Sequence, residues 1–242
     1  MAPAGYGSRV EGIHAVTAAV AAGRVERLTV ERKRRSREEI ARLIDAVGEA
    51  STVYVDDTRE IADTEAPQGV IAECTPIVPV DLDTLAAPDA AILVLDHLED
   101  PQNVGAIARS ALAGGSTGLV MSARRSAPLS AATFKAAAGA LERLPVAVVG
   151  SIPEALQRLK SHNVWAVGLD TGGDQSLFGL SLFTEPVAVV IGAEGEGLSQ
   201  LTAKRCDVIA SIPMADATES LNASVSAALA IFEIMRVRNP LR

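Results

Sequence analysis

Val187-Ala-Val-Val-Ile191-Gly-Ala-Glu194-Gly-Glu-Gly197-Leu-Ser199 places five apolar residues directly before a glycine-rich loop. A short run that is apolar at every position predicts a strand buried on both faces. Similar runs alternate with helical patterns through the second half of the chain, at residues 91–95, 118–121, 146–149, 164–169 and 208–212. We therefore expect an α/β protein whose carboxyl-terminal part has a parallel sheet with helices on both faces.

A smaller α/β unit precedes this sheet. Its periodicity predicts helices over residues 12–22 and 38–47 and short strands over residues 28–30, 53–55 and 70–72. Prolines and acidic residues are then frequent in residues 75–89, a composition typical of a linker. The expected organisation is a first domain over residues 1–74, a linker over 75–89 and a second domain over 90–242.

Composition and charge exclude several classes of protein. The 242 residues contain no apolar run long enough to span a membrane, and the first residues lack the pattern of a signal peptide, so we expect a cytoplasmic protein. Cys74 and Cys206 are far apart and have no ligand spacing around them, which predicts neither a disulfide nor a metal site. A net charge of −8 argues against indiscriminate binding to nucleic acid.

One dense basic segment contrasts with this negative charge. It lies just before the predicted helix at residues 38–47 and consists of Arg32, Lys33, Arg34, Arg35 and Arg37. Such a run is often a solvated surface with no ligand. Because the rest of the sequence has no comparable positive charge, this basic segment is where we expect phosphate contacts if the substrate is RNA.

Polar residues follow three of the predicted strands, at the sheet edge where ligands bind in parallel sheets. After the strand at residues 91–95, Asp100 can cap a helix and Pro101 suits its first turn. The helix then carries Asn103 near its start and Arg109 nearly two turns later, close to the same side. A simpler interpretation makes Asn103 a capping residue and Arg109 a partner in a surface ion pair.

The glycine-rich loop after residues 187–191 is the second of these three polar segments. Gly192, Gly195 and Gly197 flank two glutamates, whose carboxylates would repel a phosphate, so the loop favours a neutral or cationic ligand. It also differs from the dinucleotide fingerprint in spacing and position, which argues against a nucleotide-dependent oxidoreductase. Glu194 could instead serve only as a helix-capping acid.

The third polar segment follows the strand at residues 208–212, which Pro213 ends. A polar loop then leads into a helix predicted over residues 221–237, with Ser220 as its expected cap and Asn222 in its first turn. The helix carries an apolar stripe typical of a core or a subunit interface, formed by Leu221, Val225, Leu229, Phe232 and Met235.

In order and spacing, the blocks at residues 103–110, 191–199 and 212–224 resemble the three signature motifs of the SpoU (TrmH) family of RNA ribose methyltransferases, within the SPOUT superfamily. The resemblance implies a deep trefoil knot in the carboxyl-terminal domain, S-adenosylmethionine as cofactor, and a homodimer formed through this domain. It assigns cofactor contacts to Gly192, Ile212 and Leu221. It assigns the catalytic set to Asn103, Arg109, Glu194, Ser220 and Asn222.

The segments Gly12-Ile-His14-Ala-Val16 and Gln68-Gly-Val-Ile-Ala-Glu73 resemble the small substrate-binding domain, related to ribosomal protein L-thirty-e, that precedes the knot in one branch of the family. This branch methylates a guanosine ribose in bacterial 23S ribosomal RNA. The resemblance therefore implies RNA contacts from His14 and the basic segment, although a histidine among apolar neighbours is more often structural. Transfer RNA and an antibiotic-binding loop of ribosomal RNA are alternative substrates of relatives.

Methyl transfer to a ribose hydroxyl suggests a role for each matched residue. The hydroxyl must lose its proton as the new bond forms. A free guanidinium keeps its proton far above neutral pH, so we expect Arg109 to clamp a phosphate or oxyanion, with another acceptor or water as the base. Ser220 and Asn222 would orient the ribose, and Glu194 would hold Asn103 or Arg109. A non-catalytic RNA-binding ribosome assembly factor is the alternative that this complete polar set argues against.

Overall fold

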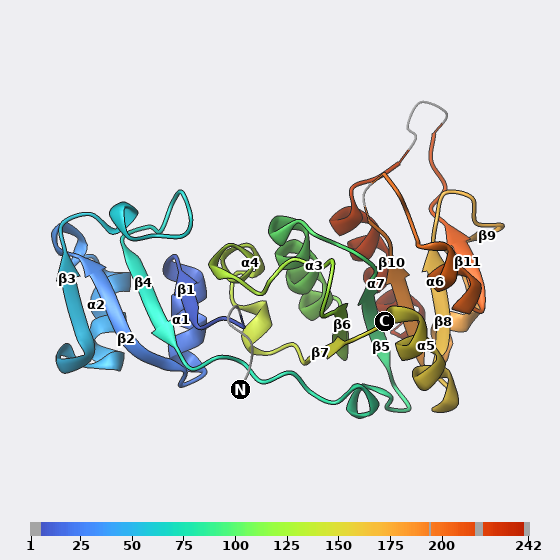
Figure 1. The fold of residues 1–242 in the computed structure, drawn as a ribbon, viewed down its shortest axis with the longest axis horizontal. Helices are drawn as coiled ribbons and strands as arrows, with labels where there is room; N and C mark the ends of the chain where they lie inside the picture. The colour runs from blue at the N-terminus through green and yellow to red at the C-terminus, as the bar shows by residue number, and fades with distance from the viewer. Residues whose placement is uncertain (1–5, 194, 216–219, 240–242) are drawn as a thin grey trace. The chain divides into compact units, whose positions relative to one another are not determined.

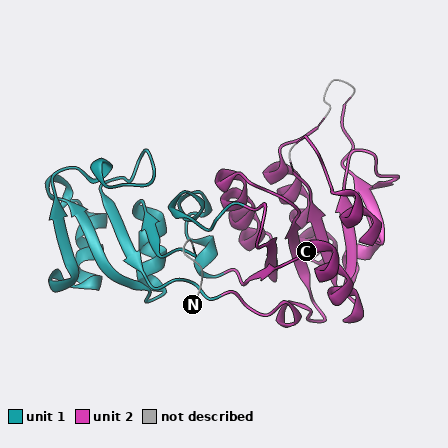
Figure 2. Ribbon diagram, viewed as in Figure 1, with its two compact units in different colours: residues 1–78, 127–143 teal, residues 79–126, 144–242 magenta. Residues whose placement is uncertain are grey.

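The computed structural model describes residues 6–193, 195–215 and 220–239, and the chain forms two compact units (Figure 2). The first unit consists of residues 1–78 and 127–143, and the second of residues 79–126 and 144–242. This division differs from the expected one in two ways. Residues 127–143 pack with the first unit, and residues 79–89 belong to the second unit instead of forming a linker.

Buried contacts explain both differences. Leu82 and Leu85 are each 3% exposed and pack in the core of the second unit. In the first unit, the Phe134 ring is buried, and Glu142 accepts hydrogen bonds of 2.5 and 2.7 Å from the Arg24 guanidinium. Arg24 and Glu142 are 118 residues apart in the sequence, so no local pattern could predict their pairing.

The first unit is built on a four-stranded sheet in the order β1, β4, β2 and β3 (Figure 1). Only β2 and β3 pair in parallel. The strands span Arg9–Glu11, Val25–Glu31, Thr52–Val55 and Val70–Cys74 for β1 to β4, and the helices are α1 (Ile13–Ala21), α2 (Glu38–Val47) and α4 (Ala131–Ala137). Strand β1, which was not predicted, has three residues and is too short to show a clear alternation.

The second unit has a seven-stranded sheet in the order β7, β6, β5, β10, β8, β11 and β9, and every neighbouring pair is parallel. Its strands are β5 (Ala91–Leu95), β6 (Gly118–Ser122), β7 (Val146–Val149), β8 (Trp165–Leu169), β9 (Gln175–Ser176), β10 (Val187–Ile191) and β11 (Val208–Ser211). All six predicted strands are present in this sheet, because central parallel strands are buried on both faces and therefore uniformly apolar.

Helices cover both faces of this sheet, as predicted. On one face, Ile92 and Val94 of β5 pack with Leu156 of α5 (Ile152–Ser161), and α6 (Gln200–Arg205) packs beside α5. On the other face, α3 (Pro101–Ala113) and α7 (Ala223–Arg238) pack against each other, and α7 contacts β5 and β10. The α/β class is thus confirmed, and the trefoil knot stays a prediction.

Short 3-10 helices complete the described structure, at η1 (Arg32–Arg34), η2 (Glu49–Ser51), η3 (Thr58–Glu60), η4 (Leu82–Leu85), η5 (Ala140–Glu142) and η6 (Ser181–Thr184). Among the helices that the structure describes, none is both long and apolar enough to cross a membrane.

Candidate active site

Several strands of the second unit end together at one edge of its sheet. Leu95, Ile191 and Leu169 are aligned at the ends of β5, β10 and β8. Ala210 of β11 pairs with Leu169 in the same parallel arrangement. The loops that follow these strands therefore meet at the edge where parallel sheets bind their ligands.

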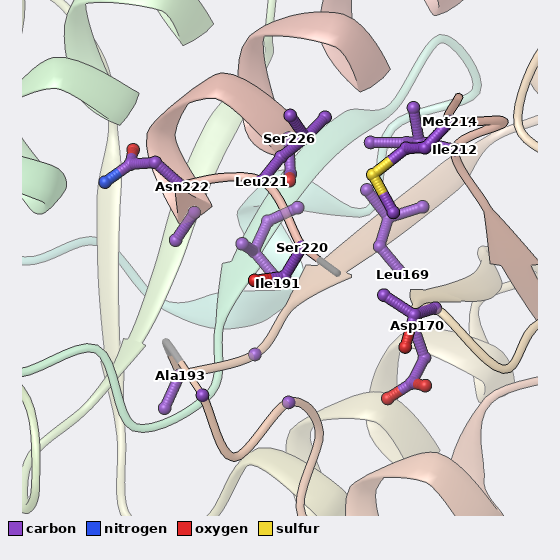
Figure 3. A pocket seen from close by; sticks show the side chains of 15 residues that line it. Leu169, Asp170, Ile191, Ala193, Ile212, Met214, Ser220, Leu221, Asn222 and Ser226 are labelled. Atoms are coloured by element: carbon purple, nitrogen blue, oxygen red, sulfur yellow. The ribbon is translucent and has the colours of Figure 1, made fainter. Parts of the chain in front are cut away.

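A cavity of about 590 Å³ lies among these loops (Figure 3). Its walls come from the loops after β8, β10 and β11 and from the first turn of α7. The three residues matched to cofactor contacts, Gly192, Ile212 and Leu221, all line it. Ser220 and Asn222 of the matched catalytic set line the same cavity, so a ligand there would touch residues of both sets.

The glycine-rich loop forms a closed turn beside this cavity. The Ala193 N–H donates to the Gly197 carbonyl at 3.1 Å, and the Gly197 N–H donates back to the Ala193 carbonyl at 2.9 Å. A Cβ atom on Gly192 would collide with the backbone of Gly197 and lie 2.6 Å from the Leu198 nitrogen. The closed turn therefore requires glycine at position 192. Glu194, predicted to be catalytic, lies outside the described residues.

A hydrogen bond joins the first and third motifs. The Asn222 Nδ2 donates to Asn103 Oδ1 at 3.0 Å, and Asn222 Oδ1 accepts from the Ser224 N–H at 2.8 Å. Asn222 is therefore the N-cap of α7, and α7 begins at Ala223. The expectation that Ser220 caps a helix beginning at residue 221 was wrong, because asparagine at position 222 caps the helix two residues later.

The start of α3 is as predicted, but its catalytic candidates do not share a side. Asp100 accepts a hydrogen bond of 2.9 Å from the Gln102 N–H, and Pro101 occupies the first turn. Asn103 is 6% exposed, whereas Arg109 is exposed and lines neither described cavity. Six residues of α-helix rotate the side chain by a net angle of about 120°, so the expectation that the two lie close to the same side was wrong.

A second cavity, of about 580 Å³, adjoins the first, and Ala193 lines both. Asn103 lines this second cavity together with His97, Arg125 and Glu196. His97 has a φ of +60°, in the left-handed region that a side chain other than glycine rarely occupies. The hydrogen bond from Asn222 to Asn103 thus connects residues that line the two cavities.

Two aspartates at this sheet edge were missed by the sequence analysis. Asp96 directly follows β5, is fully buried, and accepts a hydrogen bond of 3.0 Å from the Ser199 N–H. Its other carboxylate oxygen lies 3.1 Å from His97 Nδ1 but accepts no hydrogen bond from the described residues. Asp170 directly follows β8 and lines the first cavity. The rule that ligands bind beyond the carboxyl ends of parallel strands points to both positions.

Most of the basic segment is paired with carboxylates of the first unit. Ion pairs join Arg32 to Asp56, Lys33 to Glu31, Arg34 to Glu31, and Arg35 to Glu49. Within the described part of the chain, Arg37 has no carboxylate partner. His14 is exposed on α1, so the structural interpretation of a partly buried histidine was wrong. No described contact joins His14 to the basic segment.

The cysteines lie in the environments of unreactive thiols. Burial raises the pKa of Cys74 to about 11 and that of Cys206 to about 12. Both thiols are therefore protonated at neutral pH, and neither lines the two cavities. Among the residues that the structure describes, no cluster of histidine, cysteine and acidic side chains could hold a metal ion.

Comparison with known proteins agrees with this arrangement. Residues 90–232 match the model of the SpoU rRNA methylase family, and residues 9–79 match the model of RNA 2′-O ribose methyltransferase substrate binding. The chain is 38% identical over 216 residues to uncharacterized tRNA/rRNA methyltransferases of Mycobacterium ulcerans and Mycobacterium marinum, covering 87% of this chain and 69% of each relative. The SpoU methyltransferase AviRb of Streptomyces viridochromogenes, solved with S-adenosylmethionine, superposes with a TM-score of 0.82 at 27% identity, covering 96% of this chain and 91% of AviRb.

The first cavity fits this cofactor. Its volume lies within the range of small-molecule sites, and its walls combine apolar side chains with the backbone of the glycine-rich loop. Among its described lining residues, Asp170 is the one charged side chain, and an acidic lining suits a cofactor whose net charge is positive. The chain therefore belongs to the SpoU family of RNA methyltransferases, and its cofactor is S-adenosylmethionine.

Proposed function

We propose that this enzyme methylates the ribose 2′-hydroxyl of a guanosine in 23S ribosomal RNA. The observation that carries the proposal is the Asn222–Asn103 hydrogen bond, which joins the cofactor cavity to a second cavity of sufficient size for a nucleotide. A substrate-binding domain over residues 9–79 supports RNA as the acceptor. The resemblance of the segments around His14 and Gln68 to the 23S branch supports the choice of target.

The chain's own residues orient the acceptor in this proposal. The cofactor, when bound, supplies an electrophilic methyl group. Asn103 and Asn222 hold each other at the boundary of the two cavities, so their amides can fix the ribose in line with that group. Ser220 lines the cofactor cavity and keeps its predicted role in orienting the ribose. Arg109 keeps its predicted role as a clamp for RNA phosphate, on the exposed face of α3.

His97 is the side chain that we propose to accept the hydroxyl proton. It lines the second cavity with Asn103, and the buried Asp96 carboxylate lies 3.1 Å from its Nδ1. The other charged groups around this cavity are Glu99, Asp100, Arg125 and Glu196. Asp100 is already engaged as the cap of α3, and the Arg125 guanidinium offers only donors.

We also propose that the enzyme is a cytoplasmic homodimer formed through α7. Three of the five residues in the stripe identified in the sequence are exposed on α7. Val225, Phe232 and Met235 are 45%, 42% and 37% exposed and Leu229 is half-buried, whereas Leu221 precedes α7 and lines the cofactor cavity. The buried side of α7 is instead lined mainly by alanine and isoleucine. A second copy seated on the outer side would remove these apolar side chains from water.

Mapping of ribose methylation tests the target. Ribosomal and transfer RNA from a strain that lacks this protein should be compared by mass spectrometry with RNA from the complemented strain. We expect one guanosine of 23S ribosomal RNA to lose its 2′-O-methyl group, and the purified protein to restore it with labelled S-adenosylmethionine. Loss of a transfer RNA methylation instead would assign the chain to the alternative substrate class.

A further inference from the structure

We infer that Asp170 binds the vicinal hydroxyls of the cofactor ribose and thereby sets the position of the cofactor in its cavity. The carboxylate directly follows β8 and lines the cavity together with the glycine-rich loop (Figure 3). It is the one charged group among the described lining residues.

The Asp170 carboxylate is held rigidly before any ligand binds. Its Oδ1 accepts a hydrogen bond of 2.9 Å from the Gly172 N–H. The Asp170 backbone N–H donates to the Ala210 carbonyl of β11 at 3.0 Å, and the Asp170 carbonyl accepts from the Gly173 N–H at 3.1 Å. Gly173 in turn lies against β11 so closely that a Cβ atom there would be 2.5 Å from the carbonyl carbon of Ala210. Little conformational freedom would be lost when a ligand contacts this carboxylate.

The second carboxylate oxygen is available to a ligand. Oδ2 accepts no hydrogen bond from the described residues, and it faces the backbone of Gly197, where a Cβ atom would lie only 2.9 Å away. Gly197 has a φ of +67°, which also favours glycine. Glycine at position 197 thus lets the glycine-rich loop pass close to Oδ2 at the wall of the cavity.

The position of Asp170 indicates that it contacts the ribose and no other part of the cofactor. Asp170 lies across the cavity from Asn222, as Figure 3 shows. In the proposed function, the transferred methyl faces the side of the cavity where Asn222 lies, and this step of the inference rests on that proposal. Asp170 therefore contacts a part of the cofactor remote from the methyl group. The amino-acid tail carries both a carboxylate that Asp170 would repel and an ammonium that it would attract, so its net charge gives Asp170 no preference for it. A vicinal diol instead offers two O–H donors, and hydrogen bonds to a charged acceptor are the stronger ones.

Calorimetry with a minimal ligand tests the inference without RNA. The probe is 5′-methylthioadenosine, which keeps the ribose but lacks both the sulfonium charge and the amino-acid tail. Its 2′-deoxy and 3′-deoxy forms remove one hydroxyl each. On the parent protein, we expect at least one deoxy form to bind about tenfold or more weakly than the probe itself. Equal affinities for all three ligands on the parent protein would overturn the inference, and this measurement requires no variant.

The variant Asp170→Asn identifies the carboxylate as the partner of the hydroxyls. Asparagine can keep the turn through its own Oδ1, but it replaces the acceptor Oδ2 with a donor. We expect the variant to bind 5′-methylthioadenosine about tenfold more weakly and no longer to distinguish it from the deoxy forms. Asp174→Asn, an exposed acid of the same loop that does not line the cavity, makes the same charge change and should have no effect.

Two outcomes separate this inference from other possibilities. The deoxy penalty is the loss of affinity when 5′-methylthioadenosine lacks one ribose hydroxyl. If Asp170→Asn weakens the binding of S-adenosylmethionine but leaves the binding of 5′-methylthioadenosine and the deoxy penalty unchanged, the carboxylate acts on the cation and the ribose contact is disproved. If the deoxy penalty disappears as expected while no RNA is methylated at a ribose, the ribose contact holds and the proposed acceptor is wrong.

Discussion

Asn222 of α7 and Asn103 of α3 are 119 residues apart in the sequence, yet one side-chain hydrogen bond of 3.0 Å joins them. Each residue also has a local role, because Asn222 caps α7 and Asn103 is buried in the first turn of α3. The contact fixes the start of one helix against the start of the other. In the proposed function, an acceptor bound between the two cavities depends on this alignment.

The first prediction concerns this pair. Asn222→Ser keeps an oxygen that can cap α7 but loses the amide that donates to Asn103, so the protein should stay folded while methyl transfer falls about a hundredfold. Thermal melting and single-turnover transfer measure the two effects. Asn103→Ala and the double variant complete a double-mutant cycle. If the two single-variant losses in the rate of methyl transfer simply multiply in the double variant, the residues do not act as a pair.

The second prediction concerns Gly192. Gly192→Val places a side chain against the backbone of Gly197 and Leu198, so the closed turn cannot form and S-adenosylmethionine binding should be lost. Calorimetry in the absence of RNA measures the affinity. Gly150→Val is the matched control, since a Cβ atom at Gly150 meets no atom within 4 Å. Unchanged cofactor affinity in Gly192→Val would count against the assigned cavity.

The third prediction separates Arg109 from cofactor binding. Arg109 is exposed and lines neither cavity, so Arg109→Ala should leave the affinity for S-adenosylmethionine unchanged. If the residue clamps RNA phosphate, the same variant should nearly eliminate methyl transfer, and Arg109→Lys should keep a little activity. Lys204→Ala, an exposed cation on α6, is the control. Normal turnover of Arg109→Ala would remove the residue from the site.

The fourth prediction concerns the outer side of α7. Phe232→Glu places a charge among the exposed apolar residues, so the protein should become monomeric at micromolar concentration in light scattering. Leu201→Glu on α6 makes the same kind of change at a side chain that is 54% exposed and should leave the dimer intact. A parent protein that is already monomeric would contradict the proposed dimer.

Sequence patterns predicted the features that depend on local composition. Helix α2 was predicted with its observed bounds, because its apolar residues Ile40, Leu43 and Ile44 recur at helical spacing. The central strands of the second sheet were found because burial on both faces makes them uniformly apolar. The polar ends of those strands then located the cavity, since parallel pairing brings them to one edge.

Features that depend on long-range packing were not predictable in this way. The pairing of Arg24 with Glu142 and the burial of Phe134 assign residues 127–143 to the first unit, and neither has a local signature. The choice of Asn222 over Ser220 as a cap depends on where the chain after β11 meets α3. Asp170 was missed because a single acid after a strand is also typical of an ordinary turn.

The last prediction concerns the basic segment as a platform for RNA. An RNA loop whose target nucleotide can be turned out is easier to recognise than an RNA duplex, which hides its base edges. We therefore expect a surface that binds the RNA loop apart from the catalytic cavities. In the basic segment, Arg32 and Lys33 already pair with Asp56 and Glu31, and RNA phosphates must compete with these carboxylates. Arg37 has no such partner among the described residues, so we expect it to contribute most to RNA affinity.

RNA binding should be weaker in a triple variant that carries Arg32→Gln, Lys33→Gln and Arg37→Gln. The slope of the logarithm of RNA affinity against the logarithm of salt concentration should also flatten, by about one unit for each RNA phosphate that the protein no longer neutralises. Arg37→Gln alone should produce the largest single effect. Arg42→Gln on α2, whose guanidinium pairs with Glu38 outside the basic segment, controls for the change in net charge. S-adenosylmethionine affinity should be unchanged, because no residue of the basic segment lines the cofactor cavity. If the triple variant binds and methylates RNA like the parent at every salt concentration, the basic segment is only a solvated surface and the RNA platform lies elsewhere.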